Sequence, residues 1–296
     1  LAAGPLTVVI AGGDSPAEYA KIAATAGWPI LAEPSSNLRS APTAVATGRL
    51  LLGAPHFADR IERVVSLGHA TLSRPVTALL SRTDIPIVHV GEASTFPAPA
   101  GPNVSFHQAI TAPAADGGWA QEWIAADEKL SQNLPADEAL SVAKIVGEAA
   151  AADAILTLGP SQVLRDVDIT LPARQPLARV VSNRGLAGID GVLSTAIGAT
   201  LAHGGQGFAY LGDLTFLHGS NGLVIGPKEP RPNLCIVVLN DDGGSIFASL
   251  EQGAPEYADN FERVYATPVG AKLGDLCRSM NIAHELLSVS RSEEHT

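Results

Sequence analysis

Short apolar runs alternate along the chain with segments that have the residue spacing of helices. The runs at residues 8–11, 154–159, 208–211 and 234–239 are almost wholly apolar, and glycine, proline or polar residues bound them. Such continuous runs are typical of strands buried on both faces of a parallel sheet. Because helix patterns separate them, the sequence predicts an α/β fold with two doubly wound parallel-sheet domains.

The chain divides at a Pro-rich stretch, residues 96–102, and at an amphipathic helix predicted over 119–130. The apolar side of that helix consists of Trp119, Trp123, Ile124 and Leu130. Residues 290–296 have no apolar period and are interpreted as a non-native tail. The predicted parts are a first domain at 1–115, a linker helix at 116–134, a second domain at 135–289, and the tail.

Three local predictions rest on short motifs. Ser15 and Pro16 have the residue types of an N-cap and a first helical position, which predicts a helix over 16–26. Residues 283–287 are interpreted as a final strand. Gly12-Gly13 is interpreted as a plain strand-to-helix turn, because the second part of a Gly-x-Gly-x-x-Gly dinucleotide loop is absent.

The composition argues against several classes of partner. The net charge is −11 and the isoelectric point is about 5.1, so neither nucleic acid nor an anionic membrane surface is expected to bind. No apolar stretch reaches the ~20 residues that span a bilayer, and no leader pattern opens the chain, so we expect a cytoplasmic protein. Cys235 and Cys277 are predicted to be buried free thiols.

Two aspartates that follow apolar runs are the main candidates for chemistry. Asp213 comes after 208–211, and Asp241 comes after 234–239. The carboxyl ends of parallel strands lie where open α/β sheets bind ligands, and two carboxylates there suit Mg²⁺. The alternative is that each aspartate caps a turn. The neighbouring Asp242 is expected to point away from the ion and to hold a turn.

Three motifs make this prediction more specific: residues 182–191 (SNRGLAGIDG), 212–216 (GDLTF) and 240–247 (NDDGGSIF). They resemble motifs of thiamin-diphosphate enzymes, and most closely those of the 2-succinyl-5-enolpyruvyl-6-hydroxy-3-cyclohexene-1-carboxylate synthase family of menaquinone biosynthesis. The resemblance is clear over about residues 141–277 and weaker in the first domain. It implies a Rossmann-like middle domain followed by a domain that binds pyrophosphate and metal.

The resemblance also implies roles for individual residues. It makes Asp213, Asp241 and the carbonyl of Gly243 the ligands of Mg²⁺ or Mn²⁺. Thiamin diphosphate is expected to contact Gly212, Leu214, Thr215, Gly243, Gly244, Ser245 and Ile246. The apolar wall beside the substrate is expected from Ile246, Phe247 and Leu250, for which core packing is the alternative.

The substrates implied by the family are 2-oxoglutarate and isochorismate, which are polyanions. Arginine binds carboxylates with two parallel hydrogen bonds, so arginines near the motifs are candidates. Arg184 lies within a motif, Arg165 matches a substrate arginine of the family, and Ser161 precedes Arg165 by one helical turn. Arg74 in the first domain is a weaker candidate.

The implied activity is a decarboxylating carboligation of 2-oxoglutarate with isochorismate by a homo-oligomer, dimer or tetramer. The glutamate that activates the cofactor in this superfamily belongs to an amino-terminal pyrimidine-binding domain, and no acid here matches its motif, so no catalytic residue is assigned. We therefore expect a fragment that is inactive alone. The alternatives are another thiamin-diphosphate enzyme, such as an acetolactate synthase or a 2-oxo acid decarboxylase, or a non-catalytic cofactor-binding module.

Overall fold

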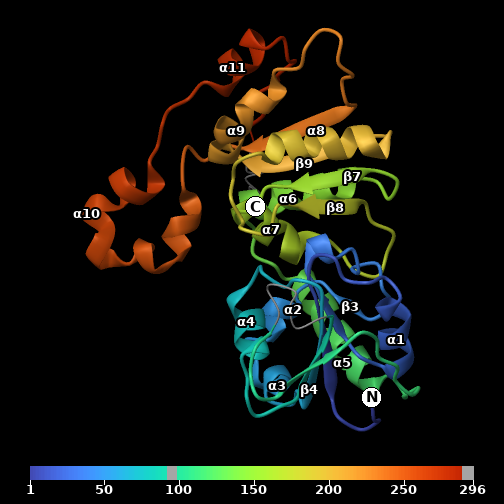
Figure 1. Ribbon diagram of the computed structural model, residues 1–296. Coiled ribbons are helices and arrows are strands. Elements are labelled where there is room, and N and C mark those ends of the chain that lie inside the picture. Colours follow the sequence, from blue (N-terminus) through green and yellow to red (C-terminus); the bar gives the residue numbers. More distant parts are fainter. Residues whose placement is uncertain (92–98, 289–296) are drawn as a thin grey trace, which may run out of the picture. The chain divides into compact units, whose positions relative to one another are not determined.

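The computed structural model describes residues 1–91 and 99–288, which form two compact units (Figure 1). Unit 1 consists of Leu1–Pro135 together with Val167–Val180, and unit 2 consists of Ala136–Asp166 and the chain from Val181 onward. The return of Val167–Val180 to unit 1 is a feature that the sequence pattern did not indicate.

Unit 1 contains a six-stranded sheet in the order β3-β2-β1-β4-β5-β6, with all adjacent strands parallel. This is the strand order of a doubly wound Rossmann-type sheet. The strands are β1 (Thr7–Ala11), β2 (Ile30–Ala32), β3 (Ala44–Val45), β4 (Arg63–Leu67), β5 (Ile87–Val90) and β6 (Val104–His107). The helices are α1 (Tyr19–Ala26), α2 (Gly48–Leu51), α3 (Pro55–Ala58), α4 (Arg74–Leu80), α5 (Gly118–Ser131) and the 3₁₀ turn η1 (Pro34–Ser36).

Both faces of this sheet are buried, as the continuous apolar runs predict. Along β1, Val9 and Ala11 join one core cluster, whereas Val8 and Ile10 join the other. This alternation is the two-residue period of a strand between two layers. The second cluster also contains Trp123 of α5, which is fully buried.

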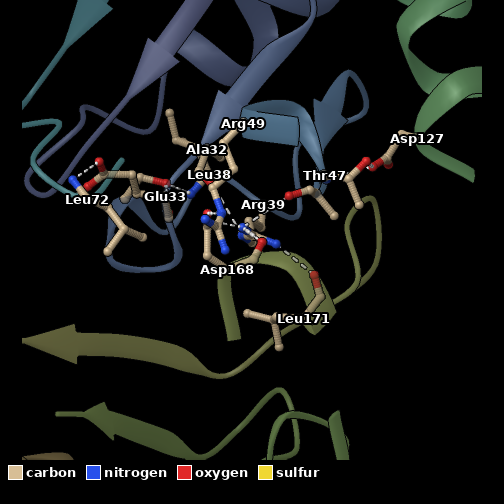
Figure 2. A network of polar contacts seen from close by, with 12 residues as sticks. Ala32, Glu33, Leu38, Arg39, Thr47, Arg49, Leu72, Asp127, Asp168 and Leu171 are labelled. Atoms are coloured by element: carbon tan, nitrogen blue, oxygen red, sulfur yellow. Dashed lines mark hydrogen bonds and ion pairs between the residues drawn. The ribbon is translucent and has the colours of Figure 1, made fainter. Parts of the chain in front are cut away.

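Buried ion pairs hold the returning segment Val167–Val180 within unit 1, and Figure 2 shows Asp168 with its two arginine partners, Arg39 and Arg49. Arg39, which is 2% exposed, pairs with Asp168 at 2.6 Å and also donates to backbone carbonyls. Arg49 approaches the other oxygen of Asp168 at 2.8 Å. Arg174 pairs with the buried Asp127 at 2.8 Å, and Asp127 also accepts a hydrogen bond from Thr47. These charges are satisfied inside the unit, which is the condition for burying them.

Unit 2 is built around a four-stranded sheet in the order β10-β9-β7-β8. Its strands are β7 (Ile155–Leu158), β8 (Arg179–Ser182), β9 (Gly207–Gly212) and β10 (Leu234–Leu239). The α-helices that alternate with them or follow are α6 (Glu138–Ala149), α7 (Gln162–Thr170), α8 (Val192–His203), α9 (Asp213–Gly219) and α11 (Leu273–Ser279). Both α7 and β8 cross the boundary between the units, because the segment Val167–Val180 that belongs to unit 1 begins within α7 and ends within β8. The shorter turns are η2 (Ser220–Leu223), η3 (Ser245–Ser249), η4 (Glu251–Gly253), η5 (Pro255–Tyr257), α10 (Ala258–Phe261) and the π-helical η6 (Glu262–Ala266).

The predicted fold class is confirmed, since both sheets are parallel and helices alternate with their strands. The amphipathic helix is also confirmed, with Trp119, Trp123 and Ile124 buried on α5. Within residues 1–91 and 99–288, no helix is long and apolar enough to cross a bilayer. The tail at 290–296 and part of the 96–102 linker lie outside these described residues.

Three local predictions were wrong. Ser15 does not cap a helix, because its hydroxyl donates to the carbonyls of Gly12 and Leu67 and α1 begins only at Tyr19. Residues 283–287 form no strand. Cys277 is a buried free thiol as predicted, but Cys235 is exposed, because it lies on β10 at the edge of its sheet.

Candidate functional site

Parallel pairing of β9 with β10 brings the two candidate aspartates to one edge of the sheet. The register aligns Gly212 with Leu239, so Asp213 follows one strand end directly and Asp241 lies two residues past the other. Asp213 is also the first residue of α9, which begins where β9 ends. The predicted topology at this edge is therefore present.

Asp213 is buried in an environment that opposes its charge. It is 3% exposed. Burial raises the pKa of the Asp213 carboxyl, and the negative charge of Asp241 raises it further, whereas the backbone N–H groups of Leu214 and Gly243 oppose the shift by donating to it. Two acids that repel each other in this way gain from a cation placed between them. Asp241 itself is exposed, so the edge is open to solvent on its side.

The oxygen donors at this edge are of the type that hard divalent cations prefer. Two carboxylates and the nearby Gly243 carbonyl form a partial donor set, and Mg²⁺ usually completes its shell with water and phosphate oxygens. In the part of the chain that the structure describes, no group of three or more His, Cys, Asp or Glu side chains could hold a metal. A site here therefore depends on a backbone carbonyl and on ligand oxygens as well as on carboxylates.

The Gly243-Gly244 pair lies tightly against a second segment of unit 2. A Cβ on Gly243 would lie 2.2 Å from the carbonyl oxygen of Ala266, and one on Gly244 would lie 2.6 Å from that of Tyr265. Gly243 also has a φ of +147°, a conformation that favours glycine. The N–H of Gly244 donates to the Ala266 carbonyl at 2.7 Å. The glycines are thus required by close backbone packing.

Asp242 holds this loop in place, in agreement with its predicted role. Its φ of +55° turns the chain. Its carboxylate accepts hydrogen bonds from the backbone N–H groups of Val269 and Gly270, at 3.2 and 2.9 Å. The partners of the loop, Ala266, Val269 and Gly270, were not found from the sequence, because backbone partners leave no side-chain pattern.

The other predicted cofactor residues surround the same two strand ends. Thr215 is buried in α9 and Leu214 is half-buried there. Ser245 is exposed and begins η3, a 3₁₀ turn whose Ile246 and Phe247 are half-buried, followed by the half-buried Leu250. The ring of Phe247 lies 5.9 Å from that of Tyr265. The predicted apolar residues therefore share one short segment directly after the glycine pair.

Two of the three candidate arginines meet on one turn of unit 2. Arg165 on α7 donates to the carbonyl of Ser161 at 3.0 Å, and Arg184 after β8 donates to the carbonyl of Pro160 at 2.9 Å. Both are half-buried. Ser161 contributes its backbone carbonyl to this contact. Arg74 lies in unit 1, exposed at the start of α4.

The corresponding edge of the sheet in unit 1 is closed by its own backbone. Gly13 and His69 form an antiparallel bridge between the loops that follow β1 and β4, with N–H to carbonyl distances of 3.1 and 2.8 Å. A Cβ on Gly12 would lie 2.0 Å from the His69 carbonyl carbon. The Gly12-Gly13 pair is therefore a structural turn, as predicted, and the bridge occupies the point where a dinucleotide would bind in such a sheet.

The curated proteins that are similar to this chain carry the same name. No protein-family model matches the chain. It is 44% identical over 316 residues to the 2-succinyl-5-enolpyruvyl-6-hydroxy-3-cyclohexene-1-carboxylate synthase of Nocardioides sp., covering 100% of this chain and 59% of that protein. The synthases of Saccharopolyspora erythraea and Thermobifida fusca are each 42% identical, and the chain covers 53% and 52% of their lengths.

The chain thus spans between half and three-fifths of the length of these curated relatives. The matches include 94–100% of the chain, so both units take part in the similarity. Over the part of these proteins that it covers, the chain is therefore similar to 2-succinyl-5-enolpyruvyl-6-hydroxy-3-cyclohexene-1-carboxylate synthases.

Proposed function

We propose that unit 2 carries the metal- and diphosphate-binding site of a thiamin-diphosphate-dependent carboligase that joins 2-oxoglutarate to isochorismate. The similarity to these synthases supports the reaction class. The observation that carries the site is Asp213, a buried carboxylate beside Asp241 whose pKa is raised by burial and by that neighbour. A divalent cation would relieve both effects, so the residues fit the group that the family implies.

In this proposal the chain's own groups bind and orient. Asp213, Asp241 and the Gly243 carbonyl would hold Mg²⁺ or Mn²⁺, and the backbone around Gly212 and Gly244 would bind the diphosphate. Asp242 fixes the loop by accepting the N–H groups of the 269–270 segment. Bound thiamin diphosphate supplies the electron sink for decarboxylation and carbon–carbon bond formation.

The arginine pair supports a substrate with several carboxylates. Arg165 and Arg184 donate to adjacent carbonyls, which places two guanidinium groups on the same Pro160–Ser161 turn. Each guanidinium is a planar fork of N–H donors whose geometry matches that of a carboxylate. The half-buried Ile246, Phe247 and Leu250 would supply the apolar side of the substrate pocket. A homo-oligomer, dimer or tetramer, is part of the same proposal, and sedimentation velocity would measure it.

Calorimetric titration of residues 1–296 with thiamin diphosphate tests the site. Binding is the suitable readout, because no acid of the chain matches the activating glutamate of the superfamily. We expect saturable heat with Mg²⁺ and none with EDTA. Asp213→Ala and Asp241→Ala should each lose it, whereas Asp242→Asn is the matched control, because asparagine keeps the acceptor for Val269 and Gly270. Equal binding with EDTA, or by Asp213→Ala, would contradict the metal assignment.

A further inference from the structure

A cavity of about 130 Å³ lies in unit 1 at the amino-terminal edge of its sheet, where β1 and β4 begin. This edge is opposite to the one closed by the Gly13–His69 bridge. The cavity is lined by residues 2–7 and by Trp28, Arg63, Gly117 and Trp119 among others. It therefore belongs to unit 1 alone and is separate from the proposed cofactor site in unit 2.

Arg63, the first residue of β4, is the charged group that distinguishes this cavity. It is only 6% exposed. Its Nε donates to the Thr7 hydroxyl at 2.9 Å, its Nη1 donates to the Ala2 carbonyl at 3.1 Å, and its guanidinium carbon lies 5.4 Å from the centre of the Trp28 ring. Each of these partners is uncharged.

No carboxylate of the described residues lies within ion-pair distance of Arg63. Burial lowers the pKa of Arg63, and no acid opposes that effect. Arg39, which is also buried in unit 1, is by contrast paired with Asp168 at 2.6 Å. A buried cation with only neutral partners is less stable than one with a counter-charge. An anion bound in the cavity would supply that counter-charge.

The remaining walls of the cavity suit an anion with an apolar body. The 14-residue helix α5 begins here, with Gly117 and Trp119 in the lining, and a helix amino terminus favours negative charge. The rings of Trp28 and Trp119 provide the apolar surface. The one acid in the lining, Asp116, is exposed, and its carboxylate accepts from the N–H of Gly118, the first residue of α5, at 3.1 Å.

We propose that this cavity binds a small monocarboxylate with a short apolar body, whose carboxylate meets Arg63 and whose body lies against Trp28 and Trp119. The volume is slightly below that of an engineered cavity of about 150 Å³ that accepts benzene, so the ligand has room for only a few carbon atoms. Arg63 retains donors on Nη1 and Nη2 beyond those used by Thr7 and Ala2.

Butyrate and butyramide test the proposal on the unaltered chain, because they differ in charge but hardly in shape. The chain has three tryptophans, Trp28, Trp119 and Trp123, and two of them line the cavity. We expect butyrate to change tryptophan fluorescence saturably and to shift the indole N–H resonances of Trp28 and Trp119. Butyramide should bind at least about tenfold more weakly, since it lacks the charge-assisted hydrogen bonds.

Variants then locate the binding. Arg63→Met should weaken butyrate binding about tenfold or more. Arg60→Met is the matched control, because Arg60 also lies over Trp119, at 4.9 Å, but pairs with Glu122 and is outside the lining. Equal responses to butyrate and butyramide, no response to either, or equal loss in the two variants would overturn the proposal. The ligand pair decides even if Arg63→Met fails to fold.

Discussion

The two sheets have the same parallel architecture but opposite chemistry at their carboxyl edges. In unit 1 the Gly13–His69 bridge joins the loops after β1 and β4, and the Glu33 carboxylate accepts the N–H groups of Thr71 and Leu72 at 2.8 and 2.7 Å. In unit 2 the buried Asp213 faces a like charge, Asp241, and its pKa is raised by burial and by that charge. The fold alone therefore does not make a site. Edge groups that the protein itself leaves electrostatically unsatisfied mark a candidate site.

The largest expected effect tests whether the acids of unit 1 are indeed satisfied internally. Asp168→Asn would leave Arg39 buried without its counter-charge, and breaking such a pair costs about 3–5 kcal/mol of unfolding free energy. Urea unfolding followed by tryptophan fluorescence reports on unit 1, because all three tryptophans lie in it. Asp14→Asn is the control, since the Asp14 side chain is 93% exposed, and it should change stability by less than about 0.5 kcal/mol.

The next effect tests the bridge that closes the edge of unit 1. Gly12→Ala would place a Cβ 2.0 Å from the His69 backbone, so the two loops must separate, at a cost of about 1–3 kcal/mol or more. Gly13→Ala is the neighbouring control, because its Cβ would meet only the Ser35 hydroxyl at 3.9 Å. Neither change should alter magnesium-dependent cofactor binding. Similar stability losses in the two variants would show that the close approach at Gly12 is not what matters.

A smaller effect, of opposite sign, tests the electrostatics of unit 2. Asp213→Asn removes a buried charge that its surroundings disfavour, so the cofactor-free chain should gain about 0.5–2 kcal/mol, as happens when strained functional groups are replaced. Calorimetry in EDTA would measure it. With Mg²⁺ and thiamin diphosphate the order should reverse, because only the wild type gains from binding. If Asp213→Asn instead lost as much stability in EDTA as Asp168→Asn does, the proposed difference between the two units would be contradicted.

Much of the fold could be predicted from the sequence, because the spacing of apolar residues along the chain indicates which faces are buried. The runs at β9 and β10 and the spacing between them indicated parallel neighbours, and the register of Gly212 with Leu239 confirms that pairing. Ser15 misled because it has the residue type of a cap, whereas its hydroxyl is used by the carbonyls of Gly12 and Leu67. Residue type states what a side chain can do, and tertiary neighbours decide which option it takes.

The structure around the candidate site could be predicted less completely than the fold, for a related reason. Asp213, Asp241 and the glycines could be placed from their motifs, and Arg165 and Arg184 share a turn. The N–H groups that donate to Asp213 and the segment behind Gly243 were not predictable, since backbone groups are the same in every residue. The pairing of buried charges could not be predicted either, because partners such as Arg39 and Asp168 are 129 positions apart in the sequence.

The smallest effect concerns Asp84, an acid whose pKa moves in the opposite direction to that of Asp213. The hydrogen bond from Arg82 and one from its own backbone N–H lower the pKa of Asp84 to about 2. Its unfolded value is near 3.9. A lowered pKa stabilises the fold above the unfolded value, and this contribution is lost as the pH falls from about 4 to about 2.

Arg82→Gln should therefore raise the pKa of Asp84 toward its ordinary value and remove that pH dependence, while leaving stability near pH 7 only slightly reduced, since the pair is exposed and screened. Carboxyl carbon NMR shifts over pH 1.5–6 would measure the change. Asp59→Asn is the control, because Asp59 acts on Arg82 only through space. If the Asp84 pKa did not move, the link between a hydrogen-bonded partner and a lowered pKa would fail. Asp213, which has a raised pKa and no cationic partner among the described residues, would then lose its value as a marker of the open edge.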